Sequence, residues 1–476
     1  MIGIEKGQTI YFLGIGGIAM AQTALLLQEM GYEVRGSDVS LYPPTDRLLQ
    51  EGGIAIEEGY DPAHLFPHPD LVVIGNAVSR GNPEVEAVLD DGIPYLSLPE
   101  LVQEVLLRER QSMVVAGTHG KTTTASLLAW LLFKGGLDPS LLIGGIPLNF
   151  GQGFRFGKGD WVVLEGDEYD SAFFDKRPKF LHYLPQVVIL NDIEYDHADI
   201  YQDLEEVKLS FRRLLDLIPR KGIAIACIDD EAVREVISRA PCRVDTFGAE
   251  GRWSPKGVRV TPKGTSFCLY RGEEDLGEFE IPLWGEHNLR NAMGAVVAAC
   301  LLGLSLPDIR QGLRTFQGVR RRMEVVGEAR GITVIDDFAH HPTAVRATLR
   351  AVRSRFSNGR LWAIFEPRTQ TMRRGFLHRE LALALGEADR VVIGSVPSPP
   401  AQGSRLDPQR LVQDIKGAQG TAAIYLEDPE EITAHCVAGV APGDVIVVMS
   451  SGYFAGLPGR ISNALNPREG LHSLRP

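Results

Sequence analysis

Two glycines, a lysine and a threonine in the stretch GTHGKTT, residues 117–123, have the types and spacing of a phosphate-binding loop. Glycine lets main-chain N–H groups approach a phosphate, Lys121 can reach the terminal phosphates of a nucleotide, and the Thr122 hydroxyl can coordinate Mg²⁺. The stretch lacks the first glycine of the full motif, because Val115 occupies that position. As a bare pattern it fits an ordinary loop as well, so the flanking elements decide its interpretation.

The flanks of this stretch favour nucleotide binding. The apolar residues 113–116 predict a buried parallel strand, and the pattern over 122–134 predicts a helix that stops at Gly135 and Gly136. A strand, a glycine turn and a helix start together place N–H groups and the positive end of the helix dipole against an anion. We therefore expect ATP to bind here.

Acidic clusters follow two further predicted strands, at 161–164 and 187–190. Glu165 opens the first cluster and His197 ends the second. Because the carboxyl ends of parallel strands meet at one edge of a sheet, both side chains could reach metal ions held by ATP phosphates. Mg²⁺ needs only one or two protein carboxylates, although histidine is a less usual ligand. A surface or capping role for His197 is the alternative.

A glycine loop near the N-terminus predicts a second ligand site. A strand at 9–13 runs into Gly14, Gly16 and Ala19, then a helix to about residue 30 and a strand at 32–35 that ends before Asp38. This is a dinucleotide-type fingerprint, with Asp38 where a ribose-binding acid is expected. On its own the fingerprint is weak, so NAD binding and a tight turn without a ligand both stay open.

Two sets of amide and hydroxyl side chains could face these ligands. Asn76 and Ser79 follow a predicted strand at 71–74, and Asn288 and Asn291 precede a helix expected at 292–302. The first pair could lie beside the ligand of the N-terminal glycine loop, and the second pair suits the edge of adenine. Turn formation and helix capping are the alternatives.

The order of strands and helices predicts an α/β chain of three domains. Strands expected at 333–335, 361–365, 391–393 and 445–449 alternate with helices in the last third of the chain. We predict a Rossmann-like N-terminal domain (residues 1–108), a P-loop-type central ATPase domain with a mostly parallel sheet (109–317), and a Rossmann-like C-terminal domain (318–476).

Composition excludes some function classes. The 476 residues carry a net charge of −12, which disfavours a nucleic-acid binder. The five cysteines are scattered without a C-x-x-C pair, as reduced thiols usually are. No signal peptide and no apolar run of membrane-spanning length are visible, so we expect a cytoplasmic protein. The oligomeric state is left open.

Considered together, these motifs resemble the Mur ligases, which are ATP-dependent amide-bond-forming enzymes of peptidoglycan synthesis. The resemblance covers nearly the whole chain and includes GIGGIAM at 14–20, GSD at 36–38, GTHGKTTT at 117–124, Glu165, the stretch ending in His197, GEHNLRNA at 285–292, RRME at 321–324 and DDFAHHP at 336–342. Single motifs of this set are unspecific, but the combination is highly specific.

The resemblance also implies a branch. GIGGIAM and THGKT resemble the branch that binds UDP-N-acetylmuramate, in which one member adds L-alanine and another attaches the recycled peptide L-alanyl-γ-D-glutamyl-meso-diaminopimelate. Segments 166–183, 365–374 and 448–457 are more similar to the second member. We therefore expect a tripeptide ligase of murein recycling that works through an acyl phosphate, with the L-alanine ligase as the alternative.

The resemblance implies a role for each matching position, with ATP and Mg²⁺ as cofactors. Lys121, Glu165 and His197 are the expected catalytic residues, and Thr122, Glu165 and His197 the expected metal ligands. The expected ATP-binding residues are Gly117, Thr118, His119, Gly120, Lys121, Thr122, Thr123, Asn288, Asn291, Arg322 and Asp337. The UDP-sugar site is expected to contain Gly14, Gly16, Gly17, Ser37, Asp38, Asn76 and Ser79.

The peptide site is inferred from charge. A tripeptide with several carboxylates favours guanidinium groups, which bind carboxylates in a bidentate way. Arg368 is the first candidate, followed by Arg373, Arg374 and Lys176, for each of which a solvated surface charge is the alternative. Other functions kept open are a folate-polyglutamylating ligase, an NAD-dependent oxidoreductase with an ATPase domain, and a nucleotide sensor without chemistry.

Overall fold

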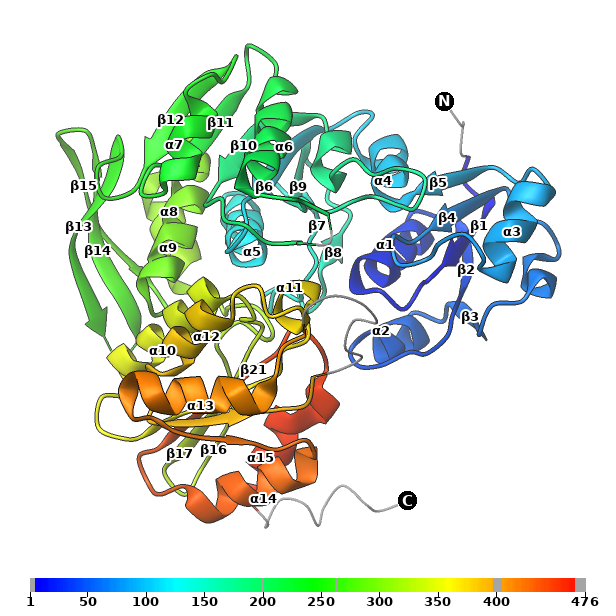
Figure 1. Cartoon of the computed structure of the whole chain (residues 1–476). Coiled ribbons are helices and arrows are strands. Elements are labelled where there is room, and N and C mark those ends of the chain that lie inside the picture. Colours follow the sequence, from blue (N-terminus) through cyan, green and yellow to red (C-terminus); the bar gives the residue numbers. More distant parts are fainter. Residues whose placement is uncertain (1–4, 199, 262, 397–404, 467–476) are drawn as a thin grey trace.

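Three β-sheets, one after another along the chain, organise the computed structural model (Figure 1). The structure describes residues 5–198, 200–261, 263–396 and 405–466. We call the three parts the N-terminal, central and C-terminal lobes. The predicted α/β class with mostly parallel sheets is confirmed. The domain boundaries at residues 108 and 317 stay predictions.

The N-terminal lobe has a five-stranded parallel sheet in the order β3-β2-β1-β4-β5. Its strand order reverses at β1, so the loop after β1 lies at a topological switch point, where α/β sheets bind ligands. The elements are β1 Thr9–Leu13, α1 Ile18–Glu29, β2 Glu33–Asp38, α2 Thr45–Glu51, β3 Ala55–Glu58, η1 Pro62–Leu65, β4 Leu71–Ile74, α3 Pro83–Asp90, β5 Tyr95–Ser97 and α4 Leu98–Leu106.

The central lobe has a ten-stranded sheet in the order β15-β14-β13-β12-β11-β10-β6-β9-β7-β8. It contains β6 Gln111–Ala116, α5 Lys121–Lys134, β7 Ser140–Leu142, β8 Phe154–Arg155, β9 Trp161–Gly166, η2 Lys179–His182, β10 Pro185–Leu190, α6 Leu204–Asp216, β11 Ile223–Cys227, α7 Glu231–Ile237, β12 Arg243–Phe247, β13 Trp253–Thr261, β14 Gly264–Arg271, β15 Glu274–Ile281, α8 Glu286–Leu301 and α9 Leu306–Arg314.

Strand β6 lies between β9 and β10 and is parallel to both. Val115 pairs with Glu165, and Ala116 pairs with Gly166 on one side and Leu190 on the other. The three strands therefore end at the same level, and the loops that follow them share one edge of the sheet. This confirms the expectation that the GTHGKT stretch and both acidic clusters meet.

Helix α8 packs closely against the sheet and against α5. A side chain at Gly294 would place its Cβ 2.9 Å from Ile189 Cγ2, which is too close for an ordinary contact. The predicted start of this helix at residue 292 is wrong. The helix begins at Glu286 after Gly285, whose φ of 95° favours glycine, so Asn288 and Asn291 lie inside it and do not cap it.

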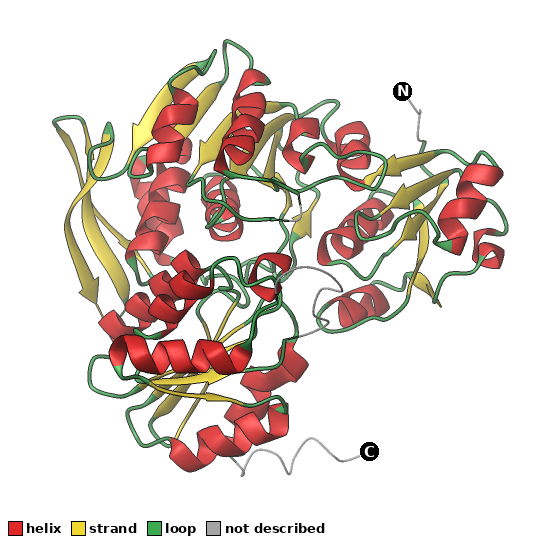
Figure 2. Cartoon of the chain, viewed as in Figure 1, coloured by secondary structure: helices red, strands yellow, loops and turns green. Residues whose placement is uncertain are grey.

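The C-terminal lobe has a six-stranded sheet in the order β16-β17-β21-β18-β19-β20, with only β16 antiparallel. Helices cover both faces (Figure 2), and each face has its own apolar cluster. The elements are β16 Glu324–Ala329, β17 Ile332–Asp337, α10 Pro342–Arg355, β18 Leu361–Phe365, α11 Gln370–Arg373, α12 His378–Leu385, β19 Arg390–Ile393, α13 Pro408–Gln419, β20 Ala422–Tyr425, α14 Pro429–Gly439, β21 Val445–Met449, η3 Phe454–Gly456 and α15 Leu457–Leu465.

Within the described ranges, none of the helices is both long enough and apolar enough to cross a bilayer. The five cysteines are free thiols.

Candidate active site

The GTHGKT stretch forms a tight loop between β6 and α5, which we call the phosphate loop (residues 117–121). Gly117 and Gly120 have φ values of 134° and 77°, in the region that favours glycine. A Cβ at Gly120 would lie 2.1 Å from Asn291 Oδ1, so no side chain fits there. The loop therefore has the glycine-dependent geometry expected of an anion site at the start of a helix.

Lys121 folds back over this loop. Its Nζ donates to the Gly117 carbonyl at 2.7 Å and to Glu168 Oε2 at 2.8 Å. Burial lowers the pKa of Lys121, and the Glu168 and Asp167 carboxylates raise it by more. Lys121 is thus a fixed positive charge at the loop.

Glu165 contacts the residue after the loop from the end of β9, where it is the next-to-last residue of the strand. Its Oε1 accepts from the Thr122 hydroxyl at 2.7 Å, and its Oε2 accepts from the Gly144 N–H at 2.8 Å. Burial and the neighbouring Asp167 raise the pKa of Glu165. A divalent cation would offset both effects, and a hydroxyl with a carboxylate is the kind of oxygen donor pair that suits Mg²⁺. These residues therefore fit the expected metal.

His197 approaches the same cluster through Glu168. His197 Nε2 lies 3.5 Å from Glu168 Oε1, while the second oxygen of Glu168 binds Lys121. Burial raises the pKa of Glu168, but Lys121 and His197 outweigh burial and lower it to about 2. Glu168 is therefore an anion that links the expected phosphate-binding lysine to the expected metal-binding histidine.

Arg322 reaches this cluster from the start of the C-terminal lobe. Its Nη2 donates to the Thr122 hydroxyl at 3.0 Å, and its guanidinium lies 4.5 Å from the centre of the Phe338 ring. Asp337 is buried and accepts from the Met323 and Ala339 N–H groups at 2.7 and 2.8 Å. Asp337 thus fixes the backbone around Arg322, and its approach to the nucleotide stays a prediction.

The two asparagines of α8 form part of a buried amide chain. Asn291 Nδ2 donates to Asn288 Oδ1 at 3.2 Å, and Asn191 Nδ2 lies 3.5 Å from Asn291 Oδ1. Asn191 also donates to the carbonyl of His119 in the phosphate loop at 3.2 Å. The chain joins α8 to the phosphate loop, beside the place expected for adenine, and recognition of the base remains a prediction.

In the N-terminal lobe, the glycine loop and the end of β2 are joined by hydrogen bonds. The Gly16 N–H donates to Asp38 Oδ2 at 2.8 Å. Strand β2 continues to Asp38, beyond the predicted end at residue 35, because Gly36 and Ser37 pair with β1. Ser37 is consequently buried, and its hydroxyl donates to Glu84 at 2.5 Å.

The remaining candidates of this lobe lie around the same edge. Gly14 has a φ of 78°, and Gly17 precedes α1 as its N-cap residue. Asn76 and Ser79 are exposed in the loop after β4. Their positions are compatible with a UDP-sugar site, which stays a prediction.

The peptide candidates differ in their surroundings. Arg368 is half-exposed, 3.6 Å from Glu366, and its side chain covers Gly452. Arg373 and Arg374 lie at the end of α11, and Arg374 donates to the Ala198 carbonyl at 3.4 Å. Lys176 is exposed and pairs with Asp170 at 2.5 Å, as a solvated surface charge would. Lys176 thus has the surroundings of a surface charge, and the role of the three arginines in peptide binding stays a prediction.

The sequence did not single out Glu168 or a second buried cation, Lys179. Lys179 Nζ lies 3.8 Å from Asp167 Oδ2 and 4.2 Å from the centre of the Tyr169 ring, and burial lowers its pKa. Both residues belong to a stretch that contains several acids and bases, and no spacing within it shows which side chains turn inward.

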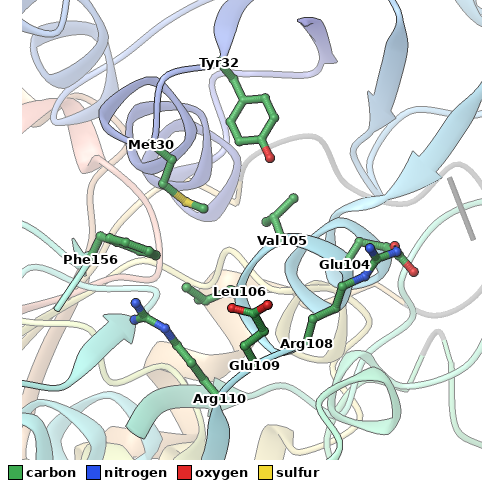
Figure 3. Close-up of a pocket in the computed structure, with 9 residues that line it drawn as sticks. All are labelled: Met30, Tyr32, Glu104, Val105, Leu106, Arg108, Glu109, Arg110 and Phe156. Atoms are coloured by element: carbon green, nitrogen blue, oxygen red, sulfur yellow. The ribbon is translucent and has the colours of Figure 1, made fainter. Parts of the chain in front are cut away.

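A cavity of about 300 Å³ lies away from this edge, at the junction of the N-terminal and central lobes (Figure 3). Met30 and Tyr32 line it from the first lobe, Phe156 lines it from the second, and the rest of its wall comes from the 104–110 segment. The Arg110 guanidinium stacks 4.1 Å from the Phe156 ring centre. None of the expected site residues lines this cavity.

Comparison with known proteins matches each lobe to a family model. Residues 9–110 match the Mur ligase family catalytic domain, residues 115–299 the Mur ligase middle domain, and residues 321–452 the Mur ligase glutamate ligase domain. The chain is also 41% identical to the UDP-N-acetylmuramate–L-alanyl-γ-D-glutamyl-meso-2,6-diaminoheptandioate ligase of Escherichia coli K12, over 96% of this chain and 98% of that protein. The chain belongs to the Mur ligase family.

Two solved structures resemble this Mur ligase over nearly its whole length. A murein peptide ligase from Psychrobacter arcticus is 34% identical with a TM-score of 0.75, covering 96% of this chain and 99% of that one. A UDP-N-acetylmuramate-alanine ligase from Thermotoga maritima is 25% identical with a TM-score of 0.82, covering 97% and 100%. The family resemblance inferred from the motifs is confirmed. The alternative of an NAD-dependent oxidoreductase with an ATPase domain is therefore set aside.

The bridging position of Glu168 in this Mur ligase leads to a prediction. Glu168→Gln keeps the size of the side chain but removes the charge shared by Lys121 and His197. We expect ATP turnover to fall about 10-fold, because hydrogen bonds to charged groups contribute about 1.5–3 kcal/mol. Steady-state phosphate release measures this effect. Glu278→Gln, at an exposed position on β15, is the matched control, and equal rates for both variants would contradict the role of Glu168.

Proposed function

We propose that this Mur ligase joins L-alanyl-γ-D-glutamyl-meso-diaminopimelate to UDP-N-acetylmuramate at the expense of ATP. The carrying observation is the shared sheet edge, where Lys121, Thr122, Glu165, Glu168 and His197 converge with Arg322 around the phosphate loop. The substrate assignment is supported by the 41% identity to a relative named for this peptide. A cytoplasmic location is part of the proposal.

The reaction divides into two transfers. The lactyl carboxylate attacks the γ-phosphorus of ATP, the bond to ADP breaks, and an acyl phosphate forms. The α-amine of the peptide then attacks the acyl carbon, phosphate leaves, and the nitrogen loses a proton. Phosphoryl transfer needs little covalent help from the protein, so positioning and charge stabilisation are the main contributions of its residues.

The residues of the shared edge supply that stabilisation. When ATP binds, the Lys121 ammonium turns from the Glu168 carboxylate to the phosphates. Arg322 brings a second positive charge from the C-terminal lobe. Thr122 and Glu165 would hold one Mg²⁺ and His197 a second, and the ions would neutralise charge on the transferring group. Asn288 and Asn291 contribute to the adenine side, and Gly14, Gly16, Gly17 and Asp38 to the uridine diphosphate side.

The same edge would serve a ligase for free L-alanine, which is the second candidate. This candidate is favoured by backbone similarity, because the TM-score to the Thermotoga maritima alanine ligase is 0.82 and that to the murein peptide ligase is 0.75. The arginines around α11 argue for the longer substrate, because Arg368, Arg373 and Arg374 suit a peptide with several carboxylates.

The amine substrate can be tested directly. Phosphate release with ATP, Mg²⁺ and UDP-N-acetylmuramate is compared in the presence of the tripeptide or of L-alanine. We expect kcat/KM to be roughly 50-fold higher with the tripeptide, because its additional groups supply binding energy that L-alanine lacks. Comparable or faster turnover with L-alanine would favour the alternative, and no release with either amine would favour a nucleotide sensor.

A further inference from the structure

Residues 192–197, which follow β10, lie between the phosphate loop and the C-terminal lobe. We call residues 192–197 the closure segment. It ends in His197, which has a φ of 53° although it is not a glycine. A non-glycine residue in this region is uncommon and needs contacts on both sides to keep it there. The contacts of this segment show where that support comes from.

On its inner side, the closure segment is tied to the phosphate loop. The Thr118 hydroxyl accepts from the Glu194 N–H at 2.8 Å and donates to the Glu194 carbonyl at 3.2 Å. The His119 N–H donates to Asp192 Oδ1 at 2.7 Å, and His119 Nε2 lies 2.8 Å from Glu194 Oε2. The backbone and the side chain of Glu194 are thus fixed by the loop that binds phosphate.

On its outer side, the same segment contacts the C-terminal lobe. The Thr343 hydroxyl donates to Glu194 Oε1 at 3.0 Å, and His341 Nδ1 lies 3.2 Å from Glu194 Oε2. The Thr371 hydroxyl donates to Asp196 Oδ1 at 2.8 Å. Two carboxylates on the segment therefore hold the start of α10 and the start of α11.

Glu194 is the residue common to both sides. Glu194 Oε2 contacts the His119 ring of the phosphate loop, and Glu194 Oε1 accepts a hydrogen bond from the Thr343 hydroxyl of the C-terminal lobe. Burial raises the pKa of Glu194, but His119 and His341 lower it to about 2, so the carboxylate is charged and accepts both contacts. If the C-terminal lobe moved away, Glu194 would keep its inner contacts and lose the outer ones.

We propose that Glu194 is a positioning residue that couples closure of the C-terminal lobe to the geometry of the phosphate loop and of His197. This inference rests on the proposed ligase function for its kinetic consequence. Closure completes the hydrogen bonds of Glu194, which fixes the closure segment and with it the placement of His197 beside Glu168. Arg322 enters the site in the same movement, because it belongs to the closing lobe.

Two variants distinguish the contacts of Glu194 with the C-terminal lobe from its contacts with the phosphate loop. Valine has almost the shape of threonine, so Thr343→Val removes only the hydroxyl that donates to Glu194 Oε1 and leaves His341 beside Oε2. Glu194→Ala removes the contacts to the phosphate loop and to the C-terminal lobe together. We expect kcat to fall about 5-fold for Thr343→Val and about 30-fold for Glu194→Ala, within the range of ordinary coupling energies. The Kd of ATP, measured without the other substrates, should be unchanged by Thr343→Val, since the phosphate loop keeps its contacts.

A double-mutant cycle distinguishes coupling from general destabilisation. If Thr343 acts through Glu194, the double variant is no slower than Glu194→Ala alone, whereas independent effects would multiply. Glu205→Gln, an exposed position on the neighbouring helix α6, is the matched control, and melting temperatures are recorded for all variants. Multiplying effects, or a kcat of Thr343→Val equal to that of the wild type, would overturn the proposal.

A measurement of shape keeps this test independent of the ligase activity. Small-angle scattering with a non-hydrolysable ATP analogue and UDP-N-acetylmuramate should show a smaller radius of gyration for the wild type and a weaker change for both variants. Equal compaction of all three proteins would overturn the role of Glu194. Normal compaction of the wild type without turnover of either amine would instead count against the proposed function.

Discussion

Replacement of Lys121 by alanine is expected to reduce phosphate release about 10³-fold. Lys121 is the only lysine side chain at the described phosphate loop, and its Nζ lies over the loop carbonyls at 2.7 and 3.3 Å. Without it, charge on the transferring phosphoryl group would lose its fixed cationic partner. Steady-state phosphate release with the tripeptide measures the loss.

The control for Lys121→Ala is a lysine at the far end of the same helix. Lys134→Ala removes an exposed charge from the last turn of α5 and should leave turnover unchanged. Binding of UDP-N-acetylmuramate to Lys121→Ala, followed by calorimetry, should equal that of the wild type, because the expected sugar site belongs to the N-terminal lobe. Equal loss of turnover and of UDP-sugar binding would contradict separate sites.

Replacement of Arg322 by alanine is expected to reduce turnover by about 10²–10³-fold. The guanidinium is held between the Phe338 ring and the Thr122 hydroxyl, so it is already oriented toward the expected metal and phosphates. Arg322→Lys keeps the charge but loses the planar fork, and should recover only part of the rate. Single-turnover kinetics at saturating ATP would place the loss in the chemical step.

Arg320→Ala provides the comparison for Arg322, since Arg320 is exposed two residues earlier in the same connection between lobes. We expect it to behave as the wild type in turnover and in thermal stability. A loss confined to the KM of ATP in Arg322→Ala, with kcat unchanged, would show that Arg322 contributes to ground-state binding and not to the transfer.

Much of the site could be predicted from local pattern because its parts follow apolar strands. The strands before the phosphate loop, Glu165 and His197 are short buried runs, and parallel pairing brings their ends together. That geometry follows from the order of the strands in the sheet and from their register. The phosphate loop was likewise recognisable although Val115 replaces a glycine.

Other features depend on contacts between distant residues. Glu168 is one of several acids after β9, and its bridge to Lys121 and His197 depends on how the backbone turns there. Ser37 was expected in a loop, but pairing with β1 carries it into the core, where it meets Glu84. Glu194 has no motif of its own, since its partners come from the phosphate loop and from α10.

The direct pairing of Val115 with Glu165 has a consequence for how variation in this protein should be interpreted. Successive side chains of a strand point to opposite faces, so a slip of one residue between β6 and β9 would turn the carboxylate of Glu165 to the wrong face. A deletion early in either strand could cause that slip without changing any residue of GTHGKT. An intact motif in a homologous sequence therefore implies the predicted metal ligand at this position only when the lengths of both strands are preserved as well.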